Sequence, residues 1–340
     1  MVAKLVRFAV RRSLNDTRHV RVVKRRHATG LVAEVYRQVE RDFKMLAPPV
    51  ALHSAAPDTL AAAWMVLRET LLAQGVADRA AKEAVATGVS LANACPYCAD
   101  VHGMTLAAIP DAGDRTGYEE WARASATGPV PAPFPAPQAA ELVGVAVAFH
   151  HYNRMVNVFL SESPFPSHVP ESAKPKARQV LGGVLRPGPD GAAPGTSVDL
   201  LPAVPVPDEL AWARGNPVVA DAFARAYAAV DAAGARSVPP NVRGVVRARL
   251  STWDGRPPGL SRSWVEDEVA GLPSEDRPAG RLALVIALSS FQLDDSLVED
   301  YRRTAPGDDT LVELAAWSSM TAARRISTWL AAPGESSAAA

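Results

Sequence analysis

Two cysteines, a histidine and a glutamate are the residues of this chain whose types and spacing could support chemistry. The stretch KEAVATGVSLANACPYCADVH (82–102) contains both cysteines of the 340-residue chain, Cys95 and Cys98. His102 follows Cys98 by four positions, and Glu83 precedes Cys95 by twelve. Such a set could form a thiol redox site or a metal site, or it could be a pair of inert cysteines with unrelated neighbours.

The spacing of Cys98 and His102 places them on one face of a helix, so that the imidazole can reach the thiol directly or through one water. Pro96 suits the first turn of that helix, where its missing N–H costs nothing. The cysteines would then lie at a helix N-terminus, whose partial positive charge favours thiolate. We therefore expect cysteine pKa values below the usual value of about 8.5, with Cys95 at the exposed mouth of the helix.

Glu83 can join this site only if the helix that carries it stops before the cysteines. On one straight helix, Glu83 and Cys98 would lie about 22 Å apart. Asn93 and Pro96 predict a break between them. We predict that one helix ends near Asn93 and a second, beginning near Pro96, crosses back over it. Glu83 would then come within one water of His102 or the thiols, although alone it could equally be a solvated surface residue.

Three other interpretations of the cysteine pair remain possible. Zinc could use the two cysteines, His102 and Glu83, but structural zinc sites usually draw on two separated ligand pairs, and the sequence holds no second pair. CPYC is also a glutaredoxin-type motif, which requires a buried strand before it, whereas a helical pattern precedes it here. Last, the cysteines could simply be buried in a core.

The elements that must position these residues are helices. Long Ala- and Leu-rich segments repeat apolar residues at helical spacing, and sustained strand-like alternation is absent. The fold class we predict is an all-α bundle. The strongest helical segments are GLVAEVYRQVERDFKML (30–46), LAAAWMVLRETLLAQG (60–75), QAAELVGVAVAFHHYNRMVNVFL (138–160) and PVVADAFARAYAAVDAAG (217–234).

Proline-rich segments divide the chain. Residues 129–138 predict an extended connector, and residues 161–208 hold ten of the 29 prolines and predict a linker between two domains. The predicted divisions are a basic N-terminal segment at 1–28, a helical domain at 29–160 that carries the cysteines, the linker at 161–208, a second helical domain at 209–332 and a disordered tail at 333–340.

An internal repeat relates the two helical domains. Shifting the chain by 198 positions places residues 78–103 on residues 276–301 without a gap, and RMVNVFL from Arg154 matches RRISTWL from Arg324. We predict that the bundle is duplicated and that the second copy is chemically empty. In that copy the four site positions are occupied by Arg281, Leu293, Ser296 and Asp300.

Composition excludes several classes of protein. The net charge is zero, which argues against nucleic acid as a partner, although nine of the first 26 residues are Lys or Arg. No apolar run is long enough to span a membrane, and the basic N-terminus lacks the apolar core of a secretory signal. We therefore expect a cytoplasmic protein without a cofactor or metal.

The motif formed by Glu83, Cys95, Cys98 and His102 resembles the signature of the AhpD-like alkylhydroperoxidase family, within the carboxymuconolactone decarboxylase superfamily. The resemblance covers residues 30–160 well and the second half only as a degraded copy. It implies an all-α bundle assembled into homo-oligomers, and reduction of organic hydroperoxides with electrons from a dithiol donor such as a lipoylated protein. Decarboxylation is disfavoured, because the decarboxylases of this superfamily lack the cysteine pair.

The resemblance also implies roles for the site residues. Glu83 would hold and polarise His102, and His102 would take the proton of Cys98. Cys98 would then attack the peroxide and Cys95 would close a disulfide, although a helix N-terminus favours the first cysteine and the roles could be inverted. Some family members carry a relay histidine between the cysteines, where this chain has Tyr97.

Two points stay open at the level of sequence. His150 and His151 are adjacent on a predicted helix and point about 100° apart, so at most one of them can face the site. The rival to a peroxidase is a non-catalytic protein, either a helical scaffold or a redox sensor whose cysteine pair switches assembly.

Overall fold

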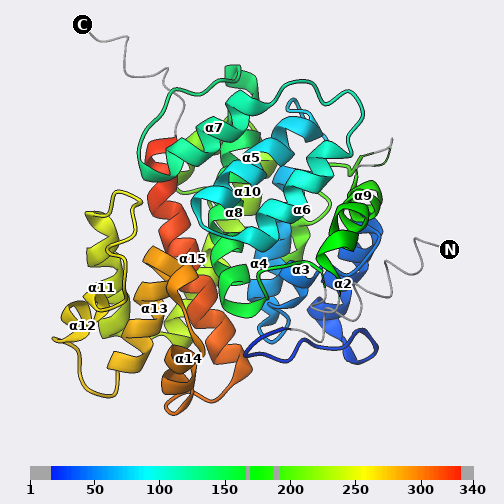
Figure 1. Cartoon of the computed structure of the whole chain (residues 1–340). Coiled ribbons are helices and arrows are strands. Elements are labelled where there is room, and N and C mark those ends of the chain that lie inside the picture. Colours follow the sequence, from blue (N-terminus) through cyan, green and yellow to red (C-terminus); the bar gives the residue numbers. More distant parts are fainter. Residues whose placement is uncertain (1–16, 166–168, 187, 189–190, 331–340) are drawn as a thin grey trace, which may run out of the picture.

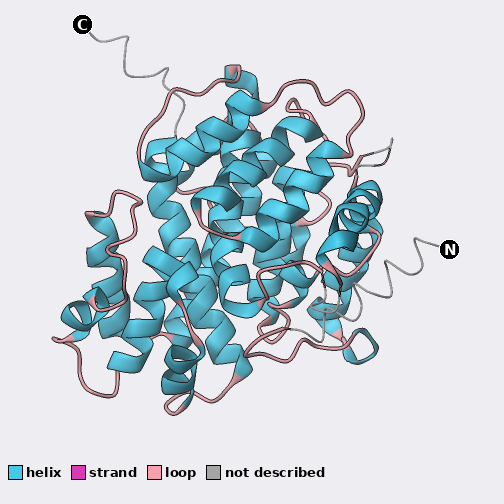
Figure 2. Ribbon diagram, viewed as in Figure 1, coloured by secondary structure: helices cyan, strands magenta, loops and turns pink. Residues whose placement is uncertain are grey.

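The structure is a computed structural model that describes residues 17–165, 169–186, 188 and 191–330, and this part of the chain forms helices and loops without a β-strand (Figure 2). Part of the basic segment at 1–28 and the tail at 333–340 lie outside the described residues. Within the described residues, the first eight α-helices are α2 (Gly30–Phe43), α3 (Pro48–Ala51), α4 (Pro57–Leu67), α5 (Arg79–Ala92), α6 (Pro96–Ala107), α7 (Thr116–Ala124), α8 (Ala139–Phe159) and α9 (Lys174–Leu185). The remaining six are α10 (Pro217–Ser237), α11 (Pro240–Ser251), α12 (Trp264–Val269), α13 (Arg277–Ser289), α14 (Asp295–Arg302) and α15 (Asp308–Leu330).

The all-α class predicted from the sequence is confirmed, and each of the four strongest helical patterns contains a helix. The prediction for the proline-rich segment was incomplete, because residues 161–208 include the α-helix α9. Its one proline, Pro175, occupies the second helical position, where a missing N–H breaks no intrahelical hydrogen bond. Residues 129–138 contain no α-helix, with bends at Pro133 and Phe134 and a single 3₁₀ turn at Ala136–Gln138.

One hydrophobic core runs through both halves of the molecule. Helix α8 lies at its centre, and nearly every residue of this helix is buried. It packs against α5 and α4 of the first half and against α15 of the second, while α4 also packs against α10 (Figure 1). The side chains that hold the site in the first half are therefore supported by helices of the second half.

Helices recur at positions that match the predicted repeat. Helix α5 begins at Arg79 and α13 at Arg277, which is 277 − 79 = 198 positions later. The next helices along the chain, α6 and α14, begin 295 − 96 = 199 positions apart. The long helices α8 and α15 begin only 308 − 139 = 169 positions apart, and α7 lies between α6 and α8 in the first half. Duplication remains a prediction, and superposition of the two halves is its direct test.

None of the described helices is both long and apolar enough to cross a membrane. Four of the tryptophans divide into two groups by burial. Trp64 and Trp317 are fully buried, whereas Trp264 and Trp329 are partly exposed at the edge of the core.

Candidate functional site

The predicted helix break lies between α5 and α6 and brings the second helix back across the first. Helix α5 ends at Ala92, Asn93 forms its C-cap, and α6 begins at Pro96 with Cys95 as its N-cap residue. Ala94 makes the turn with a φ of 47°, and the N–H of Cys95 donates to the carbonyl of Ser90 at 2.9 Å. The two helices then pack against each other.

This crossing places Glu83 directly against His102. His102 Nδ1 lies 2.6 Å from Glu83 Oε2, and Arg79 Nε donates to Glu83 Oε1 at 2.7 Å. The Glu83 side chain is fully buried, and burial alone would raise its pKa. The charges of Arg79 and His102 outweigh that effect and hold the pKa of Glu83 below its usual value. Glu83 is therefore a buried carboxylate that fixes the orientation of the imidazole.

With Nδ1 engaged by Glu83, Nε2 is the ring nitrogen of His102 that remains free to exchange a proton. The ring stands edge-on to Phe149, with centroids 4.5 Å apart, so a carboxylate on one side and an aromatic ring on another hold it in place. This arrangement is the one that a general base requires: a defined tautomer, a fixed ring plane and one open nitrogen.

Both cysteines are reduced and buried, which corrects two expectations drawn from the sequence. Cys95 was expected at the exposed mouth of the helix, yet it is only 1% exposed. Cys98 was expected to have a lowered pKa, but burial and its neighbour Cys95 raise the pKa of Cys98, while the side chain of Asn153 acts in the opposite direction. Burial is the largest cause of the rise, because the loss of hydration disfavours the thiolate.

A largely apolar cavity of about 80 Å³ opens onto Cys98 and His102. Cys95 does not line this cavity, so a reactant that enters it meets Cys98 first. Tyr97 and Tyr152 contribute the other polar groups of the wall. The apolar wall includes Phe43, Val50, Leu67, Phe149, Leu181 and Leu185.

Helix α9 forms part of the cavity wall and is attached to α6 by a small cluster separate from the main core. Leu181 packs there with Met45 and Met104. Gly182 lies so close to α6 that an added Cβ would be 2.4 Å from the carbonyl oxygen of Met104. Asp100 of α6 pairs with Arg178 of α9 at 2.9 and 3.2 Å.

Three polar residues of α8 adjoin the site, and the sequence analysis did not identify them. Asn153 donates to Ser90 Oγ at 3.1 Å, and its side chain acts to lower the pKa of Cys98. Arg154 and Asn157 bind Asn93 in the turn before Cys95. The sequence feature that could have identified them is the presence of these polar residues within the largely apolar run of residues 142–160.

Neither histidine of the adjacent pair lines the cavity. His150 Nδ1 lies 3.0 Å from Asn93 Nδ2, and His151 Nδ1 lies 2.7 Å from the hydroxyl of Ser319 in the second half. Burial keeps the pKa of both histidines well below the usual value, so both are neutral. Among the described residues, no group of three or more His, Cys, Asp or Glu side chains is placed to hold a metal ion.

Comparison with known proteins places this site in a family. The family model described as carboxymuconolactone decarboxylase family matches residues 58–109, which include Glu83, both cysteines and His102. The alkyl hydroperoxide reductase Rv2159c of Mycobacterium tuberculosis is 38% identical to this chain, over 93% of this chain and 96% of that protein. The chain belongs to the carboxymuconolactone decarboxylase family. The resemblance inferred from the motif is thereby confirmed. No solved structure matches.

The match to the Mycobacterium tuberculosis protein extends through both halves of the chain. The family model itself covers only α4, α5, α6 and the segments between them, together with the first residues after α6. The two-helix unit that holds the four site residues is thus the part that matches the family model, and the second half is shared with the full-length relative.

Proposed function

We propose that this protein is a thiol-dependent hydroperoxide reductase that attacks an organic hydroperoxide with Cys98. The observation that carries the proposal is the convergence of Cys98 and His102 on one apolar cavity, with His102 oriented by the buried carboxylate of Glu83. The full-length relative named alkyl hydroperoxide reductase supports the same chemistry.

The reaction would run in three balanced steps. The Cys98 sulfur, after giving its proton to His102 Nε2, attacks one peroxide oxygen of ROOH, the O–O bond breaks, and the proton leaves with the product alcohol ROH. Cys98 is then a sulfenic acid. The Cys95 thiol attacks that sulfur, releasing water and closing a disulfide. An external dithiol reduces the disulfide and is itself oxidised to a disulfide.

The raised pKa of Cys98 gives His102 a necessary task in this scheme. A buried thiol that stays protonated at neutral pH is a poor nucleophile, because the thiolate is the attacking species. A neighbouring base that removes the proton during attack overcomes this without a permanent buried anion. The apolar wall of the cavity favours peroxides that carry an alkyl or aryl group over hydrogen peroxide.

Turnover measurements test the proposal. The reduced protein should consume tert-butyl or cumene hydroperoxide over many cycles when a dithiol such as dihydrolipoamide is supplied. A redox sensor or scaffold would consume about one equivalent and then stop, changing only its assembly. We also propose a homo-oligomer and a dithiol donor that is a lipoylated protein, which light scattering and donor competition would examine.

A further inference from the structure

Arg154 is a buried cation without an acidic partner. It is 4% exposed, and none of the ion pairs among the described residues includes it. Its Nη1 donates to Asn93 Oδ1 at 3.1 Å and to the carbonyl of His150 at 2.7 Å, and its Nε donates to the carbonyl of Ala287 at 2.9 Å. Burial lowers the pKa of Arg154 to about 9. The guanidinium also lies 5.7 Å from the centre of the Trp253 ring, a cation–π contact that offsets part of the cost of burial. Burying a guanidinium without a carboxylate is still unfavourable, so the position calls for a physical reason.

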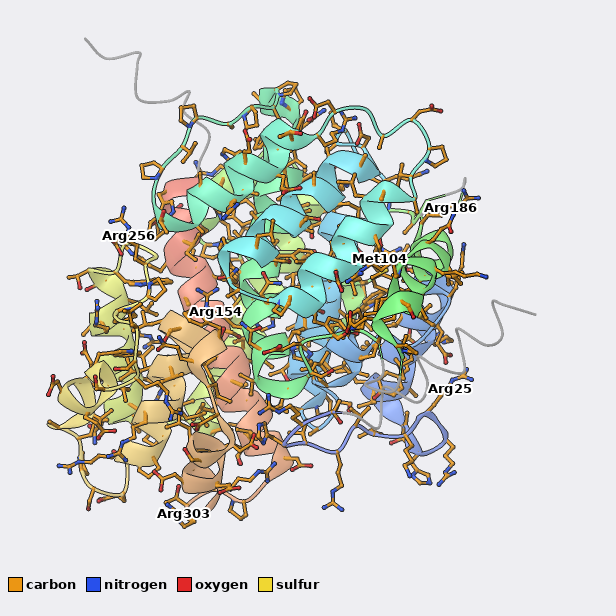
Figure 3. The ribbon with its side chains drawn as sticks, viewed as in Figure 1. Arg25, Met104, Arg154, Arg186, Arg256 and Arg303 are labelled. Atoms are coloured by element: carbon orange, nitrogen blue, oxygen red, sulfur yellow. The ribbon has the colours of Figure 1, made fainter. Side chains whose placement is uncertain are left out.

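The corresponding arginine of the predicted repeat has an ordinary environment. Arg324 pairs with Glu209 at 2.6 Å and with Asp231 at 2.8 Å, and it is partly exposed. Arg154 instead lies in the middle of the molecule, where α8 meets the second half, whereas Arg25, Arg186, Arg256 and Arg303 lie at the rim (Figure 3). The same residue type thus forms ion pairs in the second half, whereas beside the cysteine site it donates only to neutral acceptors among the described residues.

The hydrogen bonds of Arg154 set the orientation of the Asn93 side chain. A guanidinium can only donate, so the group of Asn93 that faces it must be the oxygen, Oδ1. The NH2 group of Asn93 then points the other way, toward Asn153 Oδ1 at 3.1 Å, His150 Nδ1 at 3.0 Å and the Val89 carbonyl at 3.0 Å, so its two hydrogens are shared among three acceptors. Because His150 is neutral, its Nδ1 can accept, and both contacts agree with this orientation.

The amide of Asn153 is oriented in the same way by its contact with Asn93. With Oδ1 of Asn153 facing the Asn93 donor, the NH2 group of Asn153 donates to Ser90 Oγ at 3.1 Å, and the Asn153 side chain acts to lower the pKa of Cys98. A donor to sulfur favours the thiolate, whereas a flipped amide would present an oxygen and disfavour it. The Arg154 guanidinium cannot accept a hydrogen bond, and this sets which end of each amide, oxygen or NH2, faces each neighbour.

We infer that Arg154 is a positioning residue for Cys98. It fixes the amides of Asn93 and Asn153 so that a hydrogen-bond donor faces the Cys98 sulfur when negative charge forms there. The contact of Arg154 with the Ala287 carbonyl, in the last turn of α13, gives the second half a part in this. The inference deepens the proposed function, since it concerns the nucleophile of that reaction.

Several other ionisable residues lie near the Cys98 thiol and can affect its protonation, so a test must leave them unchanged. They come from the helices packed around α6 and from α6 itself: Cys95 at the N-cap of α6, Tyr97, Asp100 and His102 on α6, Arg79 and Glu83 on α5, His150, His151 and Tyr152 on α8, His53 after α3, and Arg178 on α9. None of them is changed in the variants below except Cys95, which is replaced throughout.

The test measures the Cys98 thiol itself in a Cys95→Ser background. The rate of alkylation by iodoacetamide is followed against pH, which gives an apparent thiol pKa. Arg154→Met should slow alkylation at pH 7 by about tenfold, the order of effect of one hydrogen bond to a charged group. Arg154→Lys, which retains a cation that only donates, should restore the rate to within about threefold of the Arg154 protein.

Two further variants distinguish positioning from general destabilisation. Arg324→Met removes a matched arginine from the second half and should leave the alkylation profile unchanged. Asn153→Leu removes the donor and should shift the profile as Arg154→Met does, and the double variant should shift it no further. An unchanged profile in folded Arg154→Met or in Asn153→Leu, or full additivity of the two, would overturn the inference.

A variant at Asn93 keeps the test decisive if Arg154→Met does not fold. Asn93→Asp still accepts from Arg154, and pairs with it, but it can no longer donate to Asn153. It should slow alkylation, and Asn93→Asp combined with Asn153→Leu should match Asn153→Leu alone. Independent effects would contradict an action through Asn153. Because no peroxide is used, a failure here is separable from a failure of the proposed activity, which the turnover assay reports.

Discussion

Replacing Glu83 with glutamine should slow the first turnover while leaving the thiols in place. Glutamine has almost the same shape but carries no charge, so the imidazolium that forms when His102 takes a proton loses its charged partner. A hydrogen bond to a charged group contributes about 1.5–3 kcal/mol. If that contribution appears only when His102 becomes charged, the rate should fall roughly 10- to 150-fold, since about 1.4 kcal/mol corresponds to tenfold.

The assay is the consumption of one equivalent of cumene hydroperoxide by the pre-reduced protein, which isolates attack from later reduction. Glu313→Gln supplies a matched control, because Glu313 is also buried, accepts from Arg236 at 2.5 Å, and lies in the second half. Both variants should lose stability to chemical unfolding, and only Glu83→Gln should slow peroxide consumption. A rate within about threefold of the unmodified protein would refute the role assigned to Glu83.

Three further predictions concern stability, access and the second half. Because the pKa of Glu83 lies below the ordinary value of 4.5, the stabilisation that its carboxylate gives the folded protein is fully present above pH 4.5 and is lost as the pH falls through the lower folded-state pKa. The difference in unfolding free energy between the unmodified protein and Glu83→Gln, measured by urea unfolding, should therefore become smaller in acid. A difference that became larger in acid would contradict this prediction. Gly182→Ala should push α9 away from α6 and speed the alkylation of Cys98 by a bulky maleimide more than its alkylation by iodoacetamide. Gly183→Ala, where an added Cβ meets nothing within 4 Å, should change neither alkylation rate. Equal acceleration of the two reactions by Gly182→Ala would contradict a role of α9 in covering the cavity. Removing residues 209–340 should expose the buried faces of α4 and α8 and abolish cooperative thermal unfolding, and a sharp, reversible transition in the fragment would show that the first half is self-sufficient.

Local chemistry explains which parts of the site could be predicted from the sequence. The break between α5 and α6 was predictable, because a proline and a C-capping asparagine act within a few residues of themselves. The approach of Glu83 to His102 followed from that break and a crossing helix. The four-residue spacing of Cys98 and His102 likewise fixed their shared face before any tertiary contact was known.

The remaining features depend on tertiary packing, which the local pattern does not specify. Cys95 caps a helix and would be exposed on an isolated helix pair, but the surrounding core covers it. The same covering reverses the expected shift of the Cys98 pKa. Asn153 and Arg154 gain their role from contacts with a turn about 60 positions earlier, and helix α9 was hidden in a segment whose proline content favours extended chain.

The most direct test of the central claim is to identify which sulfur the peroxide oxidises. Each single cysteine variant would be reduced, treated with one equivalent of cumene hydroperoxide and a reagent that traps sulfenic acids, and analysed by peptide mass spectrometry. Cys95→Ser should consume about one equivalent and carry the trapped adduct on Cys98, while Cys98→Ser should consume none. An adduct on Cys95 in the Cys98→Ser protein, with Cys95→Ser unreactive, would reverse the assignment and contradict attack through the cavity that Cys98 lines.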